Sequence, residues 1–328
     1  MIMQGKASLD HLSRSNSLQA QVQGFILTCR TEGKSKKTVA FYNDNLQRFL
    51  WYVDQESLPT EANRVAPQHV RDFLLYVQSE NTRWGGKSES ARRPASQMTV
   101  RHYYNVLHNF FNWLLREEFV ADNPVAHLKK PKTFTRVMQA FSPKQVQMLL
   151  DLCDNKTTLG ARNRTIMLLL LDTGLRVSEL AGLKLIDVDM DTGSLKVMGK
   201  GGKERLVHMG AACQKAFWRY LTLYRTGQGA NLFLSEEGRL LPSTAVELMI
   251  RRLGQRARLT GVRCSAHTFR HTFAINFLRN GGNVFELQYL LGHTSLEMVK
   301  RYLGALNADD AAKAHQRCSP VDRLAIKG

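Results

Sequence analysis

The segment from Ser265 to Tyr302 contains three short sequences, SAHTFRH (265–271), LLGH (290–293) and KRY (300–302), within an otherwise helical stretch. They concentrate histidine, arginine and tyrosine, none of which is needed to build a helix. A guanidinium fits the oxygens of a phosphate, an imidazole transfers protons near neutral pH, and a phenol can act as an oxygen nucleophile. The segment therefore predicts chemistry on a phosphodiester.

The composition of the whole chain favours a polyanionic partner. Its 328 residues include 46 Lys and Arg against 28 Asp and Glu, which gives a formal net charge of +18. Each phosphate that such a surface neutralises releases counterions, so nucleic acid is the favoured partner. A basic surface that serves solubility or membrane adhesion is the alternative. The hydrophobic content of 43% and only 8 prolines predict a largely helical, globular protein with room for two domains.

The cysteines are widely spaced, without a CxxC pair and odd in number: Cys29, Cys153, Cys213, Cys264 and Cys318. This pattern predicts reduced thiols in a cytoplasmic protein, with neither a disulfide framework nor a zinc site. Residues 1–16 lack the apolar core of a signal peptide, and the longest apolar run, 166–171, is too short to span a bilayer. We therefore expect a soluble protein without a membrane partner.

Hydrophobic periodicity predicts four helices and no strands between residues 18 and 120. The first covers 18–31, the second follows Ser35, the third opens at Pro67 and the fourth at Thr99. The aromatic residues of the fourth helix recur at helical spacing, which favours core packing over base stacking. The polar loop between Glu80 and Pro94 is a better candidate for phosphate contact, unless its cations are only solvated.

These patterns divide the chain into an N-terminal extension (1–17), a helical domain (18–120), a basic linker (121–141), a second domain (142–306) and a tail (307–328). The linker sequence KKPK (129–132) is an extended basic run. It can serve as a strap over a DNA backbone or as a merely solvated connector. The tail is expected to contain a short helical piece around 309–315.

The second domain begins with expected helices at 144–153 and 163–171, and the latter is apolar nearly all round. Arg176 follows the turn that ends this buried helix, a costly place for a charge without an anionic partner. That partner is either Glu179 or a bound phosphate, with Glu179 then in a supporting role. Further helices are expected at 212–224 and 243–258.

Two short strands, 194–198 and 205–209, flank the loop sequence GKGGKE (199–204). The glycines suit a tight hairpin turn. The loop superficially resembles a nucleotide-binding P-loop, but it lacks the Lys-Ser/Thr ending and the strand-to-helix context. A mobile hairpin that carries a lysine to a phosphate is the better interpretation.

Taken together, the motifs TGLRVSEL (173–180), GKGGKER (199–205), HTFRHT (267–272), LLGH (290–293) and the tyrosine at 302 resemble the tyrosine recombinase, or phage integrase, family. These motifs are most similar to those of the Xer-type members of the family. The resemblance covers 18–306 and is dense from Arg162 onward. It implies a mainly α fold, with an N-terminal four-helix core-binding (SAM-like) domain. The C-terminal catalytic domain would be mostly helical with a small antiparallel sheet.

The resemblance implies six catalytic residues: Arg176, Lys200, His267, Arg270, His293 and Tyr302. The tyrosine would attack the scissile phosphate, leaving a 3′-phosphotyrosine and a free 5′-hydroxyl. The two arginines would stabilise the charge of the pentacoordinate transition state. Lys200 would protonate the leaving 5′-oxygen, His267 would accept the tyrosine proton, and His293 would orient the phosphate. No metal or cofactor is required.

Other residues are expected to support this site or to bind DNA. Glu179 and His271 are expected behind the catalytic residues, and Lys203 competes with Lys200 for the general-acid role. The candidates for DNA contact are Lys36, Lys37, Lys129, Lys130, Lys132, Lys203 and Arg205. One departure from the family pattern is Leu303-Gly304 after the tyrosine, which leaves open how the tyrosine segment is anchored.

The expected function is site-specific recombination of double-stranded DNA through a Holliday junction. A homo-tetramer, or a hetero-tetramer with a related recombinase, would assemble on two sites, and the 307–328 tail would dock on a neighbouring protomer. The task is integration or transposition of a mobile element, or Xer-type chromosome-dimer resolution. The N-terminal extension and the Glu80–Pro94 loop favour the mobile element. The alternatives are a type IB topoisomerase and a catalytically silent DNA-binding relative.

Overall fold

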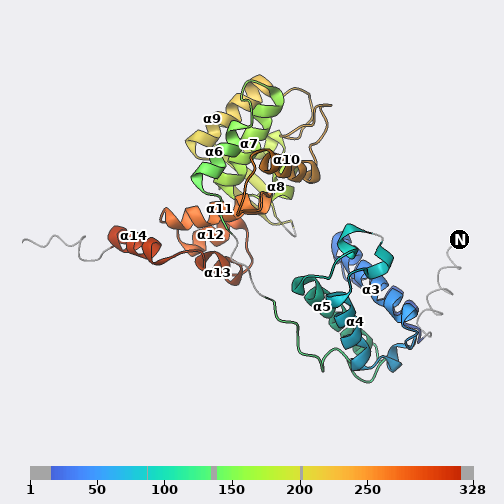
Figure 1. The fold of residues 1–328 in the computed structure, drawn as a ribbon. Helices are drawn as coiled ribbons and strands as arrows, with labels where there is room; N and C mark the ends of the chain where they lie inside the picture. Colours follow the sequence, from blue (N-terminus) through green and yellow to red (C-terminus); the bar gives the residue numbers. More distant parts are fainter. Residues whose placement is uncertain (1–15, 87, 134–138, 200–201, 319–328) are drawn as a thin grey trace, which may run out of the picture. The chain divides into compact units, whose positions relative to one another are not determined.

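The computed structural model describes residues 16–86, 88–133, 139–199 and 202–318 (Figure 1). The chain divides into two compact units, residues 1–135 and 136–328. Each unit has its own hydrophobic core, and each is described by itself.

The first unit is built from α2 (Leu18–Thr31), α3 (Lys36–Gln55), α4 (Pro67–Ser79) and α5 (Gln97–Arg116), with short 3₁₀ turns between them. Serine side chains cap α2, α3 and α5 by accepting hydrogen bonds from backbone N–H groups of the first turn. The cap of α5 is Ser96, so this helix starts two residues before the expected Thr99. The predicted helical domain without strands is confirmed for the described part of this unit.

Helix α5 forms the centre of the first core. Tyr103, Phe110, Phe111 and Leu114 are at most 1% exposed. These rings contact other rings of the core, as Tyr103 does edge to face with Phe73 at a centroid distance of 5.4 Å. Core packing, and not base stacking, accounts for these aromatics.

The loop between Glu80 and Pro94 is attached to this core and is not a free polar loop. Arg83 is buried and donates to the backbone carbonyls of Ser90 and Arg93. Trp84 packs against the rings of Trp51 and Tyr76. Arg83 is therefore occupied within the protein, which leaves other cations of the loop for any phosphate.

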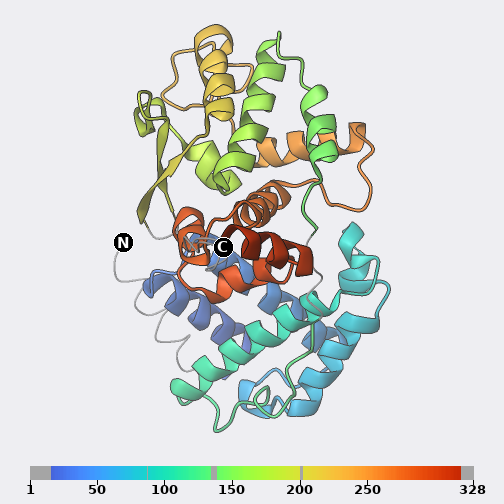
Figure 2. The same ribbon diagram turned by 90° about the vertical axis from the view of Figure 1, so that its left-hand side faces the viewer.

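The second unit contains the following helices in its described part: α6 (Pro143–Asp151), α7 (Thr158–Thr173), α8 (Val177–Gly182), α9 (Ala211–Arg219), α10 (Ser243–Arg256), α11 (Ala266–Arg279), α12 (Val284–Leu291), α13 (Glu297–Leu303) and α14 (Ala308–Cys318). A π-helical turn, Tyr220–Tyr224, continues α9. The described strands β1 (Val188–Asp189), β2 (Ser194–Met198) and β3 (Glu204–His208) form an antiparallel sheet in that order. Figure 2 shows the β2–β3 hairpin at the edge of the helical body of this unit. The predicted fold class is confirmed.

Two local differences from the sequence expectations have simple causes. Strand β1 has two residues, too few for an alternating pattern to reveal it. Helix α7 begins at Thr158, before the expected Asn163, because the Thr157 hydroxyl accepts from the Gly160 N–H. In the described parts of the chain no helix is long and apolar enough to cross a membrane. Cys29, Cys153, Cys213 and Cys264 are free thiols.

The turn after α7 brings it close to α11. Gly174 ends α7 with a φ of 62°, and a Cβ built there would lie 2.3 Å from the Phe273 ring. Only glycine permits both the left-handed backbone and this approach. Beside this contact, α11, α12 and α13 bury a small cluster of their own: Phe273, Ala274, Leu287, Leu291, Val299 and Tyr302. The same packing positions the predicted catalytic residues.

Candidate active site

Arg176 lies directly before α8, where the sequence placed a charge in need of a partner. Its Nη1 is 2.8 Å from Oε1 of Glu179, and its backbone N–H donates to Oε2 of the same carboxylate. The Arg176 side chain is still 33% exposed. Within the described chain its Nε and Nη2 make no hydrogen bond, so the guanidinium can still bind an anion.

Glu179 also pairs with a second arginine, Arg205 of β3. The Arg205 Nη1 and Nη2 lie 3.1 and 2.8 Å from the two carboxylate oxygens, and its Nε donates to the Leu290 carbonyl at the end of α12. Burial alone would raise the pKa of Glu179, but the hydrogen bonds from Arg205 and Arg176 hold this pKa below its ordinary value. Arg205, expected at a DNA surface, is buried instead and connects the sheet to α12.

Arg270 on α11 is the most enclosed cation of the site. It is 3% exposed, and it donates to the carbonyls of Gly174 and Leu291 at 2.6 and 2.7 Å. Among the described residues no carboxylate lies within ion-pair distance of it. Burial, followed by the charge of Arg176, lowers the pKa of Arg270 to about 10, so the group stays protonated at neutral pH.

His293 follows Gly292, the left-handed residue that ends α12. Its Nε2 accepts from Arg270 Nη2 at 2.9 Å, which assigns the proton of the neutral ring to Nδ1. Nδ1 is buried and has no hydrogen-bond partner among the described residues. Burial, then the charge of Arg270, lowers the pKa of His293 to about 4. The ring is therefore neutral at pH 7 and keeps one N–H donor for a further acceptor.

The other two histidines, both on α11, differ in exposure. His267 is exposed at the first turn of the helix, whereas His271 is buried. Partial desolvation and then the charge of Arg301 lower the pKa of His267. The His271 ring lies 5.2 Å from the Tyr302 ring. His267 is thus the more accessible imidazole, and His271 is part of the packing around the tyrosine.

Tyr302 lies on α13 with no exposed surface. Its ring is parallel to that of His293 at a centroid distance of 6.2 Å, and its hydroxyl accepts from Arg301 Nη2 at 3.0 Å. Val299, one turn earlier, is buried in the same cluster. The side chains of Val299 and Tyr302 anchor α13 on α11 and α12. The segment before Leu303-Gly304 is therefore held by packing within this chain.

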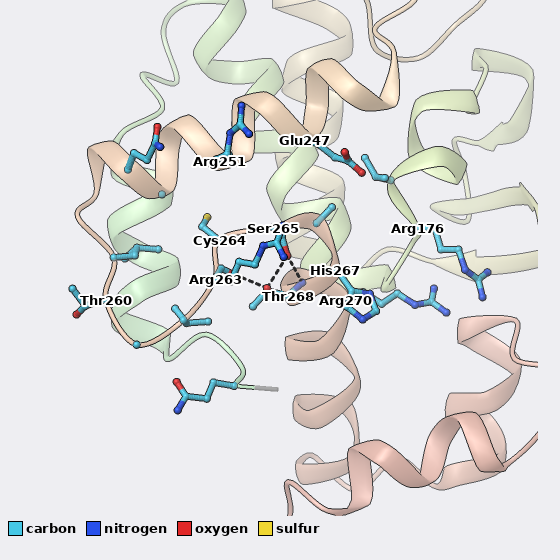
Figure 3. Close-up of a pocket in the computed structure, with 18 of the residues that line it drawn as sticks. Arg176, Glu247, Arg251, Thr260, Arg263, Cys264, Ser265, His267, Thr268 and Arg270 are labelled. Carbon is cyan, nitrogen blue, oxygen red and sulfur yellow. Dashed lines mark hydrogen bonds between the residues drawn. The ribbon is translucent and has the colours of Figure 1, made fainter. Parts of the chain in front are cut away.

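An open cavity of about 1330 Å³ adjoins these residues. Figure 3 shows the guanidinium groups of Arg176 and Arg270 close together beside His267 at one end of it. Three further arginines, Arg251, Arg258 and Arg263, line the same cavity and are exposed. They extend the positively charged lining beyond Arg176 and Arg270. The sequence analysis did not single out these three arginines because no motif contains them.

Lys200 falls outside the described residues. Lys203 directly precedes β3 and is exposed. The other candidates for DNA contact belong to the first unit, and all are exposed: Lys36, Lys37, Lys129, Lys130 and Lys132. Conversely, the structure adds Arg301, which the motif-based analysis passed over although it directly precedes the tyrosine.

The chemistry of the cluster is that of an anion site beside a phenol. The guanidinium groups of Arg176 and Arg270 meet the neutral imidazole of His293. Among the described residues the one carboxylate paired in this cluster is that of Glu179, which binds both Arg176 and Arg205. No group of three or more His, Cys, Asp or Glu side chains in the described chain is arranged to hold a metal ion. A phosphate group would supply both the missing negative charge and acceptors for the free N–H groups.

Comparison with known proteins agrees with this geometry. The family described as "Phage integrase family" matches residues 139–308, and "Phage integrase, N-terminal SAM-like domain" matches residues 22–120. The chain is 31% identical to Tyrosine recombinase XerC of Staphylococcus saprophyticus over 290 residues, 87% of this chain and 92% of the relative. It is also 31% identical to Tyrosine recombinase XerC of Oceanobacillus iheyensis over 313 residues, 93% and 97% of the two chains.

The fold has solved counterparts as well. The Tn1549 transposon integrase, in complex with a circular intermediate DNA, aligns with 93% of this chain and 100% of its own at a TM-score of 0.71 and 19% identity. The chain belongs to the phage integrase family, that of the tyrosine recombinases, enzymes that cleave and rejoin DNA.

Proposed function

We propose that this chain is a site-specific recombinase that cleaves double-stranded DNA with Tyr302 and rejoins it through a 3′-phosphotyrosine. The observation that carries the proposal is the buried guanidinium of Arg270, which has no carboxylate partner in the described part of the chain. A buried charge without a counterion is costly. A scissile phosphate beside Arg270 and Arg176 would provide that counterion.

Each step of cleavage has a candidate group. The phenolic oxygen of Tyr302 attacks phosphorus as the bond from phosphorus to the 5′-oxygen breaks, and the phenolic proton passes to His267. Lys200 gives a proton to the departing 5′-oxygen. Arg176 and Arg270 bind the non-bridging oxygens. Attack of a 5′-hydroxyl on the phosphotyrosine reverses the step and rejoins the strand.

His293 would add a neutral donor to this set. Because its Nε2 already accepts from Arg270, its Nδ1–H is the group that can donate to a phosphate oxygen. The pKa of about 4 keeps this tautomer neutral throughout the physiological range. His293 thus orients the phosphate without adding charge.

The burial of Tyr302 implies that α13 shifts when DNA binds, since a hydroxyl without exposed surface cannot reach a phosphate on a duplex. The segment after α13 is tied to its own chain by Arg279 and Asp310, 3.1 Å apart. We propose that assembly of a tetramer on two DNA sites replaces such contacts. Residues 307–328 would then dock on a neighbouring protomer, and strand exchange would proceed through a Holliday junction.

Two biological tasks lie within this proposal. The XerC relatives are the basis for Xer-type chromosome-dimer resolution. The Tn1549 integrase, a likeness of fold alone, and the N-terminal extension are the basis for integration or transposition of a mobile element. The location of the cleaved DNA sites, at element ends or at one chromosomal locus, distinguishes them.

The direct test is covalent capture of DNA by the full-length chain. The probe is a pool of duplexes with a randomised central sequence, and adducts that survive denaturation by detergent are recovered and sequenced. The wild type should enrich one sequence, and Tyr302→Phe should recover none. Absence of a wild-type adduct contradicts the proposal. Vigorous relaxation of supercoiled DNA that lacks the enriched sequence would instead indicate a topoisomerase.

The role of Lys200 has its own test. Lys200→Ala should slow cleavage of the enriched duplex by about 100-fold. The loss should be much smaller when sulfur replaces the scissile 5′-oxygen, because a thiolate leaves without protonation. Lys203→Ala is the matched comparison on the same loop: if Lys203 only contacts DNA, it should change the rates on the two substrates by the same factor. Equal losses on both substrates for Lys200→Ala would exclude it as the general acid.

A further inference from the structure

Arg301, directly before Tyr302 on α13, contacts the hydroxyl of the tyrosine. Its Nη2 donates to the phenolic oxygen over 3.0 Å, and its guanidinium carbon lies 5.0 Å from the centroid of the ring. Arg301 is exposed, whereas Tyr302 is completely buried. The guanidinium therefore meets the buried hydroxyl from the solvent side.

The charge of Arg301 is not neutralised by a carboxylate. Its neighbour Lys300 forms an ion pair with Glu297 at 3.0 Å, both side chains being well exposed. Arg301 has no such partner within ion-pair distance among the described residues, and its hydrogen bond goes to the phenol. Two adjacent cations on one helix thus differ in what they bind.

The field of Arg301 also reaches the histidines around the tyrosine. After desolvation, Arg301 is the largest cause of the lowered pKa of His267. It contributes, after burial and Arg270, to the lowered pKa of His293. The guanidinium is therefore part of the same electrostatic site as the proton acceptor and the phosphate-binding residues.

We propose that Arg301 is a further catalytic residue, whose guanidinium holds the phenolic oxygen of Tyr302 and stabilises the negative charge that develops there. This inference rests on the proposed role of Tyr302 as the nucleophile. During attack the bond from the phenolic oxygen to phosphorus forms, the bond to the 5′-oxygen breaks, and the phenolic proton leaves to the base. Arg301 stays protonated throughout, so it donates to the oxygen and cannot be that base.

The position of Arg301 on α13 makes this role compatible with movement of the nucleophile. His271 and His293 belong to α11 and to the turn after α12, so a shift of α13 changes their distances to Tyr302. Arg301 is the adjacent residue of the same helix and moves with the tyrosine. Its hydrogen bond can therefore persist while Tyr302 approaches the phosphate.

The test measures the single-turnover rate of covalent adduct formation by the full-length chain. The probe is the duplex enriched by wild-type capture, used at neutral pH. Arg301→Met should slow the reaction about 10- to 100-fold, the range of one charge-assisted hydrogen bond. Arg301→Lys, which keeps a charged donor, should recover part of the rate.

Lys300→Met is the matched control, since it removes the same charge one residue away. It should stay within about twofold of the wild type, as expected for an exposed ion pair. The rings of His271 from α11 and His293 from beyond α12 also lie beside the Tyr302 ring, and Arg270 from α11 interacts with Tyr302 electrostatically. They are present in every variant, so the difference between Arg301→Met and the wild type isolates the guanidinium.

Two results would overturn the assignment of Arg301: a loss no larger than that of Lys300→Met, or faster adduct formation by Arg301→Met. The second would indicate that the guanidinium restrains the tyrosine. A wild-type chain that forms no adduct contradicts the nucleophile itself and is distinguishable from both. Thermal unfolding of each variant verifies that the fold is retained, and Arg301→Lys provides the test if Arg301→Met is unstable.

Discussion

Two tyrosines in this chain, one in each unit, are buried with an arginine at the hydroxyl. Tyr103 on α5 is 1% exposed and accepts from Arg48 Nη1 at 2.9 Å. Tyr302 on α13 is 0% exposed and accepts from Arg301 Nη2 at 3.0 Å. In both pairs the arginine is exposed. Burial and a guanidinium at the hydroxyl therefore do not by themselves mark a reactive tyrosine.

The two tyrosines differ in the side chains that pack against their rings. The ring of Tyr103 packs on Phe73 and Trp84, which carry no charge. The ring of Tyr302 lies beside His271 and His293, and His293 is hydrogen-bonded to the buried Arg270. A phenolate or a phosphate would be stabilised only in the second place. We therefore expect the reactivity of a buried tyrosine to depend on the cations and proton acceptors around its ring, and not only on the arginine at its hydroxyl.

Removal of each hydroxyl in turn tests most directly whether the two tyrosines differ in reactivity. Tyr302→Phe should abolish the covalent DNA adduct and retain the fold. Tyr103→Phe should leave the adduct yield unchanged and lower the free energy of unfolding by about 1 kcal/mol, the usual value of one hydrogen bond. Denaturing gels and urea unfolding measure the two effects. An adduct lost in Tyr103→Phe would mean that the two tyrosines do not differ in the proposed way.

The carboxylate behind the second site provides the next test. Glu179→Gln leaves the buried Arg205 without a counter-charge, so the free energy of unfolding should fall by about 3 kcal/mol. Glu204→Gln removes a carboxylate from an exposed pair with Lys196 on the same sheet and should cost less than about 1 kcal/mol. Equal losses of stability would show that Glu179 does not hold this group of cations together.

The smallest expected effect concerns His293 and pH. Its pKa of about 4 lies below the ordinary value of 6.5, so between these values the unfolded chain binds more protons than the folded one. Stability from this residue is fully present above pH 6.5 and falls by about 2 kcal/mol as the pH drops toward 4.5.

His293→Gln keeps an acceptor for Arg270 but cannot titrate, so its stability should decrease less over this interval than that of the wild type. Urea unfolding at several pH values measures the difference. A His293→Gln slope equal to that of the wild type would place the titration elsewhere.

Local sequence patterns were sufficient for the secondary structure and for most of the site. Apolar spacing and capping serines determine helices α2, α3 and α5, because helix ends depend on hydrogen bonds to adjacent residues. The glycines at 174 and 292 have left-handed backbones that place Arg176 and His293 just beyond α7 and α12. Arg176, His267, Arg270, His293 and Tyr302 could therefore be named from short motifs.

Arg205 and Arg83 show where such patterns fail. Arg205 was expected to contact DNA, and Arg83 belongs to the polar loop that was expected to contact phosphate. Both side chains are buried. Arg205 meets Glu179 from 26 positions away in the sequence, and Arg83 is enclosed by a loop folded on aromatic rings. A charged residue in a sequence carries no sign of the carboxylate or carbonyls that it will meet across the fold.

The sequence by itself determined the family, the helical elements and five of the described site residues, because these depend on residue type and short-range spacing. Only the tertiary structure decided which cations remain free for a phosphate. Glu179 pairs with Arg176 and Arg205, and Arg301 donates to the Tyr302 hydroxyl. Arg270 is buried with no carboxylate of the described residues within ion-pair distance. The physical reason is that burial and pairing of charges arise from contacts between segments far apart in the chain.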